Sequence, residues 1–303
     1  MGLRVLLSLI LILSLVGCTT TYKRETPSTN QASVMRKLPP FDTIVARGDM
    51  MIKIIGDTTQ NDVRILGPRK AVEGMYTEVK DNVLYLQTKS NNKTDPSGKS
   101  IVLIVRSQRL HRLAYEGNGS VDGVGIKTHF FKVYVKSDRR VHLRGRMGLA
   151  NLKVLGKGDV ILEGIDSEHT TVDIEGDSKV TLTGVVGLTK LDYEGAGCLS
   201  MHWIDSHDLI VNASGTGELQ LAGVVGTFEA TIKDKTMLDA RYLRATQSYV
   251  KTYDKAEADI YSIDTQYAFA ADHSDIYYHA RTPRDGRHHY MAALGSILDG
   301  KMD

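Results

Sequence analysis

The sequence repeats itself at intervals of 18 to 20 residues between Leu113 and Ala280. In each repeat one position is a glycine, a serine or an aspartate, and we call this position the turn column. Glycine tolerates tight turns because it lacks a Cβ, and serine and aspartate do so because their side chains bond to nearby backbone. The turn column consists of Gly117, Ser137, Gly156, Gly176, Gly195, Gly215, Asp234, Asp254 and Asp272. Self-similarity at a fixed period of this length is typical of stacked repeat architectures.

Apolar residues alternate with polar residues on both sides of the turn column. They stand four and two residues before each member and four and six residues after it, as Val172, Ile174, Val180 and Leu182 do around Gly176. Such strict alternation predicts two short, half-buried strands per repeat. A second column, mostly glycine and eight residues after the first, predicts a corner at which the chain turns back.

These features predict an all-β fold: a parallel β-helix, or β-solenoid, with about 20 residues per coil and equivalent positions stacked at about 4.8 Å. The apolar residues lack the spacing of three and four that a helix requires. A propeller blade needs about 40 residues, which is twice the length of this repeat. We place the repetitive solenoid at residues 113–280 and an irregular opening β segment at residues 41–112.

Residues 281–303 are expected to cap the solenoid, because an open solenoid exposes unpaired strand edges. The predicted cap is a short amphipathic helix at residues 286–299, with Asp285 and Gly300 as its end signals. Its apolar face would consist of Tyr290, Met291, Leu294, Ile297 and Leu298. A helix that binds a partner is the alternative interpretation.

The first 17 residues have the features of a bacterial secretion signal. Arg4 precedes an apolar run at residues 6–16, which is too short to span a bilayer. The run ends in a leucine, a valine and a glycine before Cys18, and this pattern resembles the lipobox of bacterial lipoproteins, whose cysteine carries the lipid. We therefore predict a signal peptide at residues 1–17 and lipidation of Cys18, which would anchor the chain in a membrane.

A flexible tether is predicted at residues 18–40, which are polar and rich in threonine, serine and proline. Thr19 stands where many lipoproteins that stay in the inner membrane carry an aspartate. The predicted location is therefore the outer membrane, on its periplasmic side or at the cell surface.

Charge and motifs exclude several functional classes. Lys and Arg number 38 and Asp and Glu number 36, so there is no basic excess for a nucleic acid partner. Zinc-helix, phosphate-loop and nucleophile-elbow motifs are absent from the sequence. Cys198, the second cysteine, is interpreted as a passive thiol because no base is identifiable beside it. We expect neither an enzyme nor a bound cofactor or metal.

Three aspartates of the turn column, Asp234, Asp254 and Asp272, should stack on one another. Like charges at about 4.8 Å repel unless neighbouring groups compensate them, and Lys233 and Lys255 are available to do so. A ladder of Asx turns is one interpretation. A calcium site that bridges the coils is the other.

The last coils are the predicted ligand-binding end, because eight of the 14 tyrosines lie between Tyr242 and Tyr290. Aromatic rings beside carboxylates on a flat β face could hold a sugar chain. Tyrosine is also simply a favourable strand residue. The candidate ligand face comprises the outward residues Asp239, Arg241, Asp259, Tyr261, Tyr277 and His279.

Several segments in order resemble the head GIN domain family, whose members are described as auto-transporter adhesins. They are Phe41-x-x-Ile44, Val79 followed by Val83-Leu84-Tyr85-Leu86, residues 101–105 and Glu116-Gly117-Asn118-Gly119-Ser120-Val121. The resemblance covers residues 41–280. It implies an exported, often lipidated protein that folds as a right-handed β-helix, and it provides no catalytic residues.

Two functional hypotheses follow. The first is a lipid-anchored envelope protein that presents a β-solenoid for adhesion or scaffolding, with glycans or envelope proteins as partners. The second is a β-helix protein that binds or degrades polysaccharides. A degrading enzyme would need carboxylates that converge in a groove, whereas the outward columns carry mixed residues.

Replacing the predicted lipid attachment site tests the anchor. Cys18→Ala should release the protein from the membrane fraction or block its processing, because the thiol that accepts the lipid is gone. Membrane fractionation and palmitate labelling measure the effect. Labelling of the variant equal to that of the wild type would show that the lipid is attached elsewhere.

Overall fold

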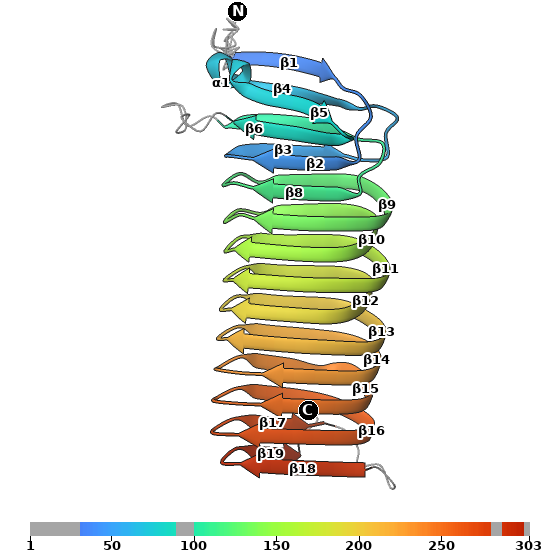
Figure 1. Cartoon of the computed structure of the whole chain (residues 1–303), viewed down its shortest axis with the longest axis vertical. Coiled ribbons are helices and arrows are strands. Elements are labelled where there is room, and N and C mark those ends of the chain that lie inside the picture. Colours follow the sequence, from blue (N-terminus) through green and yellow to red (C-terminus); the bar gives the residue numbers. More distant parts are fainter. Residues whose placement is uncertain (1–30, 89–99, 280–286, 300–303) are drawn as a thin grey trace, which may run out of the picture.

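The computed structural model describes residues 31–88, 100–279 and 287–299. The predicted signal peptide, Cys18 and the first part of the predicted tether lie outside these residues. The described chain is almost entirely β-strand and forms one continuous β-solenoid (Figure 1). Within it, no helix has both the length and the apolar character needed to cross a bilayer.

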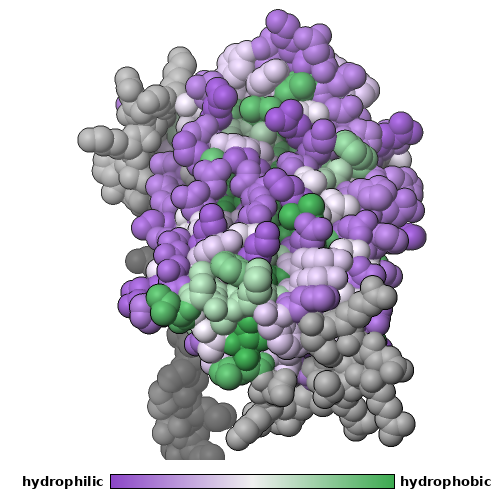
Figure 2. Space-filling view, turned by 60° about the horizontal axis from the view of Figure 1, so that its bottom comes forward, coloured by the Kyte–Doolittle hydropathy of each residue, from purple (hydrophilic) through white to green (hydrophobic). Residues whose placement is uncertain are grey.

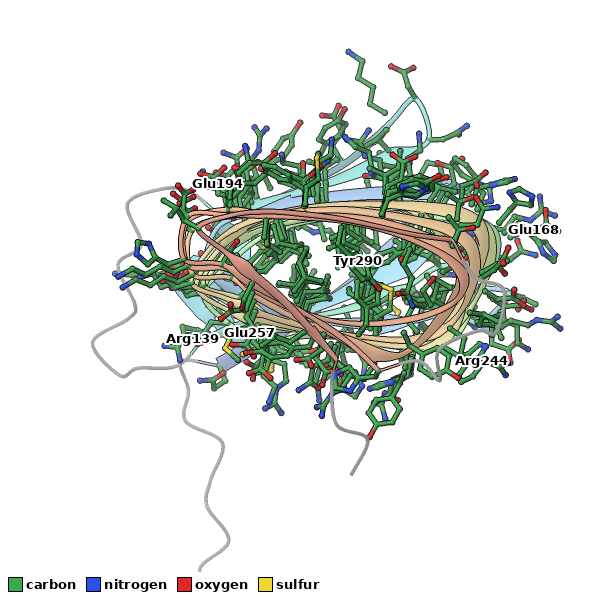
Figure 3. The ribbon with its side chains drawn as sticks, turned by 90° about the horizontal axis from the view of Figure 1, so that it is seen from below. Arg139, Glu168, Glu194, Arg244, Glu257 and Tyr290 are labelled. Atoms are coloured by element: carbon green, nitrogen blue, oxygen red, sulfur yellow. The ribbon has the colours of Figure 1, made fainter. Side chains whose placement is uncertain are left out.

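Long bent strands make up the regular part of the solenoid. Each strand runs along one face, bends at the corner and returns along the opposite face, so that one strand supplies nearly one coil (Figures 1 and 3). Neighbouring strands are parallel and in register, with Val141 beside Val160 and Val160 beside Val180. The strands are β9 (Val121–Lys136), β10 (Val141–Gly156), β11 (Asp159–Gly176), β12 (Lys179–Gly195), β13 (Cys198–Gly215), β14 (Glu218–Ile232), β15 (Met237–Thr252) and β16 (Glu257–Ala271).

The predicted inward columns form the core. All four are buried along the whole repeat, and Val180, Leu191 and Leu219 have no exposed surface. Seen along the axis, the apolar side chains fill a flattened oval between two faces (Figure 3). The alternation in the sequence therefore predicted correctly which side chains point inward.

The turn column also lies where it was predicted. Gly156, Gly176 and Gly215 have φ angles of +112°, +107° and +111°, which residues with a Cβ rarely adopt. A Cβ at Gly176 would lie 2.5 Å from the carbonyl oxygen of Gly156 on the preceding coil. Asp234 and Asp254 have φ angles of +63°, a left-handed conformation that aspartate tolerates better than most side chains.

The opening segment is continuous with the solenoid, but its coils do not follow the order of the chain. Strands β2 (Thr43–Arg47) and β3 (Met50–Ile55) form one coil. On one side this coil pairs with the coil of β8 (Arg112–Glu116) and β9. On the other side it pairs with the coil of β6 (Val83–Thr88) and β7 (Ile101–Arg106). Beyond β6 and β7, the antiparallel strands β5 (Met75–Lys80) and β4 (Asp62–Pro68) extend the sheet.

The N-terminal end of the solenoid is closed by a strand and a short helix (Figure 1). Strand β1 (Gln31–Lys37) pairs antiparallel with β4, and α1 (Arg69–Glu73) buries Val72. Residues 31–37 were predicted to belong to the flexible tether, and this part of the prediction is wrong. The backbone of residues 31–37 pairs with the edge of β4. This pairing uses backbone groups, so polar side chains do not prevent it.

The C-terminal end differs more strongly from the prediction, because residues 287–299 contain no helix. Strand β18 (Arg287–Ala293) pairs with β16, and β19 (Ser296–Asp299) pairs with β17 (Asp275–Tyr278), so these residues add a further coil. Ile297 continues the core column of Ile276. Of the apolar residues assigned to the helical face, Tyr290 and Ile297 continue core columns, and pairing with the edges of β16 and β17 favours the strand.

Two neighbouring substitutions test the register of the solenoid. Val180→Asp should lower the melting temperature strongly, because it places an unpaired charge in the core and removes about 1.5–3 kcal/mol of apolar burial. Thr181→Asp should have little effect, because Thr181 lies on the outer surface, half-exposed. Thermal unfolding followed by circular dichroism measures both. Equal losses in the two variants would contradict the observed register.

Candidate functional site

The solenoid presents two long outer faces. In each coil, the residues that follow the turn column form one face, which we call the downstream face. The residues that precede the turn column form the opposite face, which we call the upstream face. Figure 3 shows Glu257 and Glu194 on these opposite faces, both near the turn column. The predicted ligand residues belong to the downstream face and to the corner beside it.

The structure brings three of the predicted ligand residues into one column. Asp239 of β15, Asp259 of β16 and Tyr277 of β17 are neighbours in register. Arg241 donates two hydrogen bonds to the carboxylate of Asp239, at 3.0 and 2.9 Å. These bonds lower the pKa of Asp239. The carboxylate is therefore ionised and already paired.

His279 and Tyr261 complete the predicted set in different ways. His279 is buried, and its Nε2 lies 2.5 Å from Oδ1 of Asp259. The register shifts at the corner, so that Tyr261 is the neighbour of Arg244 rather than of Arg241. The predicted ligand face is therefore assembled only in part, and its two carboxylates are engaged by Arg241 and His279.

The stacked aspartates of the turn column form a ladder between coils. The backbone N–H groups of Gly215, Asp234 and Asp254 each donate to the carboxylate of the next turn-column aspartate, at 2.9, 3.3 and 3.2 Å. The predicted Asx turns would bond within one coil, whereas these bonds join adjacent coils. Among the described residues, no three carboxylate, imidazole or thiol groups converge as a metal site. Calcium binding by this column stays the alternative interpretation.

An aromatic ladder on the upstream face was not predicted. The rings of Tyr249 of β15, Tyr267 of β16 and His289 of β18 are stacked, with centroids 4.8 and 4.7 Å apart and planes within 6° of parallel. The three residues are in register on adjacent strands, five residues before the turn column in the first two coils. The recurrence of tyrosine at this position in consecutive repeats was the signal in the sequence that could have revealed the ladder.

Two shallow hollows flank the column that contains Lys251, Phe269 and Met291. One, of about 620 Å³, lies between this column and the aromatic ladder. The other, of about 500 Å³, lies on the side of the turn column and is lined by Thr231, Lys233, Lys251, Tyr253, Asp254 and Asp272. Together they give the last coils an amphipathic upstream surface.

Ring geometry differs between the two hollows. The ladder rings cover one another, so they direct mainly their edges to solvent. Tyr253 and Phe269 are instead tilted by 52° at 5.7 Å, and Nζ of Lys233 lies 5.9 Å from the Tyr253 ring centroid. No described carboxylate lies within salt-bridge distance of Lys233 or Lys251. This surface therefore offers ring faces and ammonium groups to a ligand.

An acidic hollow of about 380 Å³ lies further toward the middle of the upstream face. Lys153 bonds to Asp173 and Glu175, at 2.7 Å each, and these bonds raise the pKa of its ammonium group. Lys190 lies 2.6 Å from Asp192. Neighbouring lysines thus pair with the carboxylates of this cluster. The cluster is a set of surface ion pairs, like those of the downstream face, and does not have the arrangement of a catalytic acid and base.

Comparison with known proteins identifies the class to which this solenoid belongs. The family described as "Putative auto-transporter adhesin, head GIN domain" matches residues 40–198 and, a second time, residues 170–281. The chain belongs to this head GIN domain family. The two matches overlap at residues 170–198, within the regular part of the solenoid. No curated protein matches the chain.

Solved structures with a similar fold include two from species of Parabacteroides. An adhesin candidate from Parabacteroides distasonis has 15% sequence identity and a TM-score of 0.50, and the alignment covers 89% of this chain and 97% of that one. Another, from Parabacteroides merdae, has 15% identity and a TM-score of 0.49, with coverages of 90% and 98%. The likeness to the Parabacteroides distasonis structure supports the fold.

One partly buried carboxyl group of the downstream face provides a test by pH. Burial, and then the charges of Asp259 and Asp275, raise the pKa of Glu257 above its usual value of 4.5. The folded protein thus holds this proton more tightly than the unfolded chain, and stability falls as the pH rises above about 4.5. Glu257→Gln should raise the melting temperature at neutral pH and leave it unchanged in strong acid.

Glu218→Gln is the matched control, because Glu218 occupies the equivalent position two coils earlier and is exposed. Its melting temperature should follow the wild type across the same pH range in calorimetry. A parallel response of both variants would contradict the proposed environment of Glu257.

Proposed function

We propose that this chain is a lipid-anchored protein of the cell envelope that presents its solenoid for adhesion or as a scaffold and catalyses no reaction. The match to an adhesin family over residues 40–281 carries the proposal. A long β-solenoid suits the role, because stacked coils hold surface columns at fixed spacing over a large area.

The pairing of carboxylates supports a role without catalysis. Polysaccharide hydrolases need two carboxyl groups on either side of a sugar bond, one of them protonated to act as the acid. On the predicted face, Arg241 holds Asp239 in its ionised form, and the neighbour of Asp259 is the buried His279. Both carboxylates of the predicted face are thus engaged by neighbouring side chains.

The proposed location rests on the sequence before β1. Lipid on Cys18 would hold the chain at the outer membrane, and the polar residues that follow would separate the solenoid from the bilayer. Strand β1 lies at one extreme of the solenoid, so the anchored end would be the one that α1 and β1 close (Figure 1).

Polysaccharide binding is a second candidate function, and the upstream hollows favour it. Sugars place their C–H faces on aromatic rings and their hydroxyl groups on charged side chains. Tyr253 and Phe269 offer such rings, and Lys233 and Lys251 offer donors, within one continuous surface. Tyr277 is the register neighbour of Asp259, so Tyr261 and Tyr277 of the predicted face stand in different columns and are less suited to this role.

The test is to incubate the purified full chain with peptidoglycan and with surface polysaccharides, with and without calcium. Binding is expected without new reducing ends or unsaturated products. Replacing Tyr253 and Phe269 together by alanine should weaken binding about tenfold or more, since each ring contact contributes about 0.5–1.5 kcal/mol. Replacing Tyr261 and Tyr277 together is the matched control and should have little effect.

Each alternative has its own signature in this experiment. Released products would show that the protein is an enzyme. A larger loss from the Tyr261 and Tyr277 replacements would assign binding to the downstream face. Failure to bind any envelope polysaccharide or envelope protein would contradict the adhesive function.

A further inference from the structure

The two ends of the solenoid are built differently. At the N-terminal end, β1 covers the edge of β4 with an antiparallel strand, and α1 covers part of the core. At the C-terminal end, β18 pairs only with β16 and β19 only with β17 among the described strands. The opposite edges of β18 and β19 therefore present backbone N–H and C=O groups to which no described strand is bonded.

Apolar side chains are exposed at this C-terminal end. Leu294, Met291 and Leu298 are 87%, 66% and 46% exposed. Ile297 continues a core column yet is only partly buried, whereas Ile276, its neighbour in the preceding coil, is completely buried. Figure 2, in which this end comes forward, shows hydrophobic residues gathered there. Among the described residues, the core is covered at this end only in part, by the ring of Tyr290, which stacks on that of Tyr278.

The residues of this edge carry few of the features that keep edge strands apart. Natural edge strands usually carry lysine, other charges or proline, which prevent pairing with another chain. Strands β18 and β19 contain no Lys or Pro, and their charged residues, Arg287 and Asp299, stand at the start of β18 and the end of β19. By contrast, β1 at the opposite end contains Arg36 and Lys37 and is followed by Pro39 and Pro40. Of the two described ends, the C-terminal edge is the better suited to binding a further strand.

We propose that the C-terminal end is a docking surface for a second copy of this chain, joined end to end. A two-fold axis normal to the two faces would place β18 antiparallel to β18 of the second copy, and β19 antiparallel to its β19. Antiparallel pairing continues a sheet without a crossover. A second copy has the same oval cross-section, so it covers both edges and the exposed apolar end at once, which a single foreign strand would not do.

This geometry determines what the dimer would connect. The closed ends, which carry β1, would point away from each other. If the chain is anchored through Cys18 as proposed above, each copy would belong to a different membrane, and docking would join two facing surfaces. The inference rests on that anchoring and identifies the partner in adhesion as the protein itself.

The experiment uses the full lipidated chain in phospholipid vesicles, and light scattering measures vesicle clustering. Vesicles that carry the wild-type chain should cluster with one another and not with protein-free vesicles. Met291→Lys combined with Leu298→Lys should abolish clustering, because it places charge on both edges. Val185→Lys combined with Ile210→Lys is the matched control, since these residues are 47% and 42% exposed but lie in the middle of the solenoid.

Thermal unfolding of both double variants excludes loss of folding as the cause, and Leu294→Lys, at the most exposed of these apolar positions, gives an independent third variant. Clustering that survives the edge charges, clustering with protein-free vesicles, or no clustering at all would overturn the inference. Growth into filaments in sedimentation experiments would also overturn it, because a two-fold contact closes at the dimer.

Failure of this inference can be distinguished from failure of the proposed function. A chain that binds envelope polysaccharides but leaves vesicles dispersed is an adhesin that does not bind itself. If the chain does not enter vesicles, the anchor is wrong, and sedimentation of the purified chain then tests end-to-end docking alone. A dimer that the Met291 and Leu298 changes convert to monomer supports docking, and a wild-type monomer contradicts it.

Discussion

Every feature of this protein depends on the parallel, in-register stacking of one coil on the next. Backbone hydrogen bonds between coils fix the register, and each side chain then has its column neighbours at the spacing of the strands. A residue type repeated in the sequence becomes a continuous line in the structure. Core columns bury Val, Leu and Ile against one another, and the turn column brings the backbone of adjacent coils within a few ångströms.

The turn column shows how the same constraint is met by two chemistries. In the early coils glycine adopts positive φ, and the missing Cβ leaves room for the carbonyl oxygen of the coil before, as at Gly176 and Gly156. In the last coils aspartate adopts the left-handed conformation, and its carboxylate accepts a hydrogen bond from a backbone N–H of the preceding coil. The carboxylate of Asp254, for example, accepts from the backbone N–H of Asp234. The bond disperses the carboxylate charge, so that stacked aspartates are tolerated.

Stacking also separates stability from recognition. Ion pairs such as Arg241 with Asp239 lie on the surface, where a pair contributes at most about 1 kcal/mol, so the core columns carry most of the stability. Surface columns are therefore free to vary. In this chain the variation gives a charge-paired downstream face, an aromatic and basic upstream surface in the last coils, and two ends that differ in charge and closure.

The sequence by itself determined the solenoid, its period, the inward columns and the turn column, because these depend only on alternation and on residues that tolerate positive φ. Asp239, Asp259 and Tyr277 share a column in the structure, five residues after the turn column, as this period requires. The sequence did not determine how Tyr261 lies relative to Arg241, because a register shift at the corner arises from packing of whole coils. Nor did it reveal the stacked rings of Tyr249, Tyr267 and His289, since the last of these lies beyond the regular repeat.

The tertiary structure alone decided the two ends. Residues 31–37 read as a polar linker and residues 287–299 as an amphipathic helix, and local sequence favours neither strand. Both became strands because a neighbouring edge, β4 in one case and β16 with β17 in the other, supplied backbone partners. Hydrogen bonds to an existing sheet edge outweigh the weak helical or coil preference of a short segment. Such an edge exists only once the rest of the chain has folded.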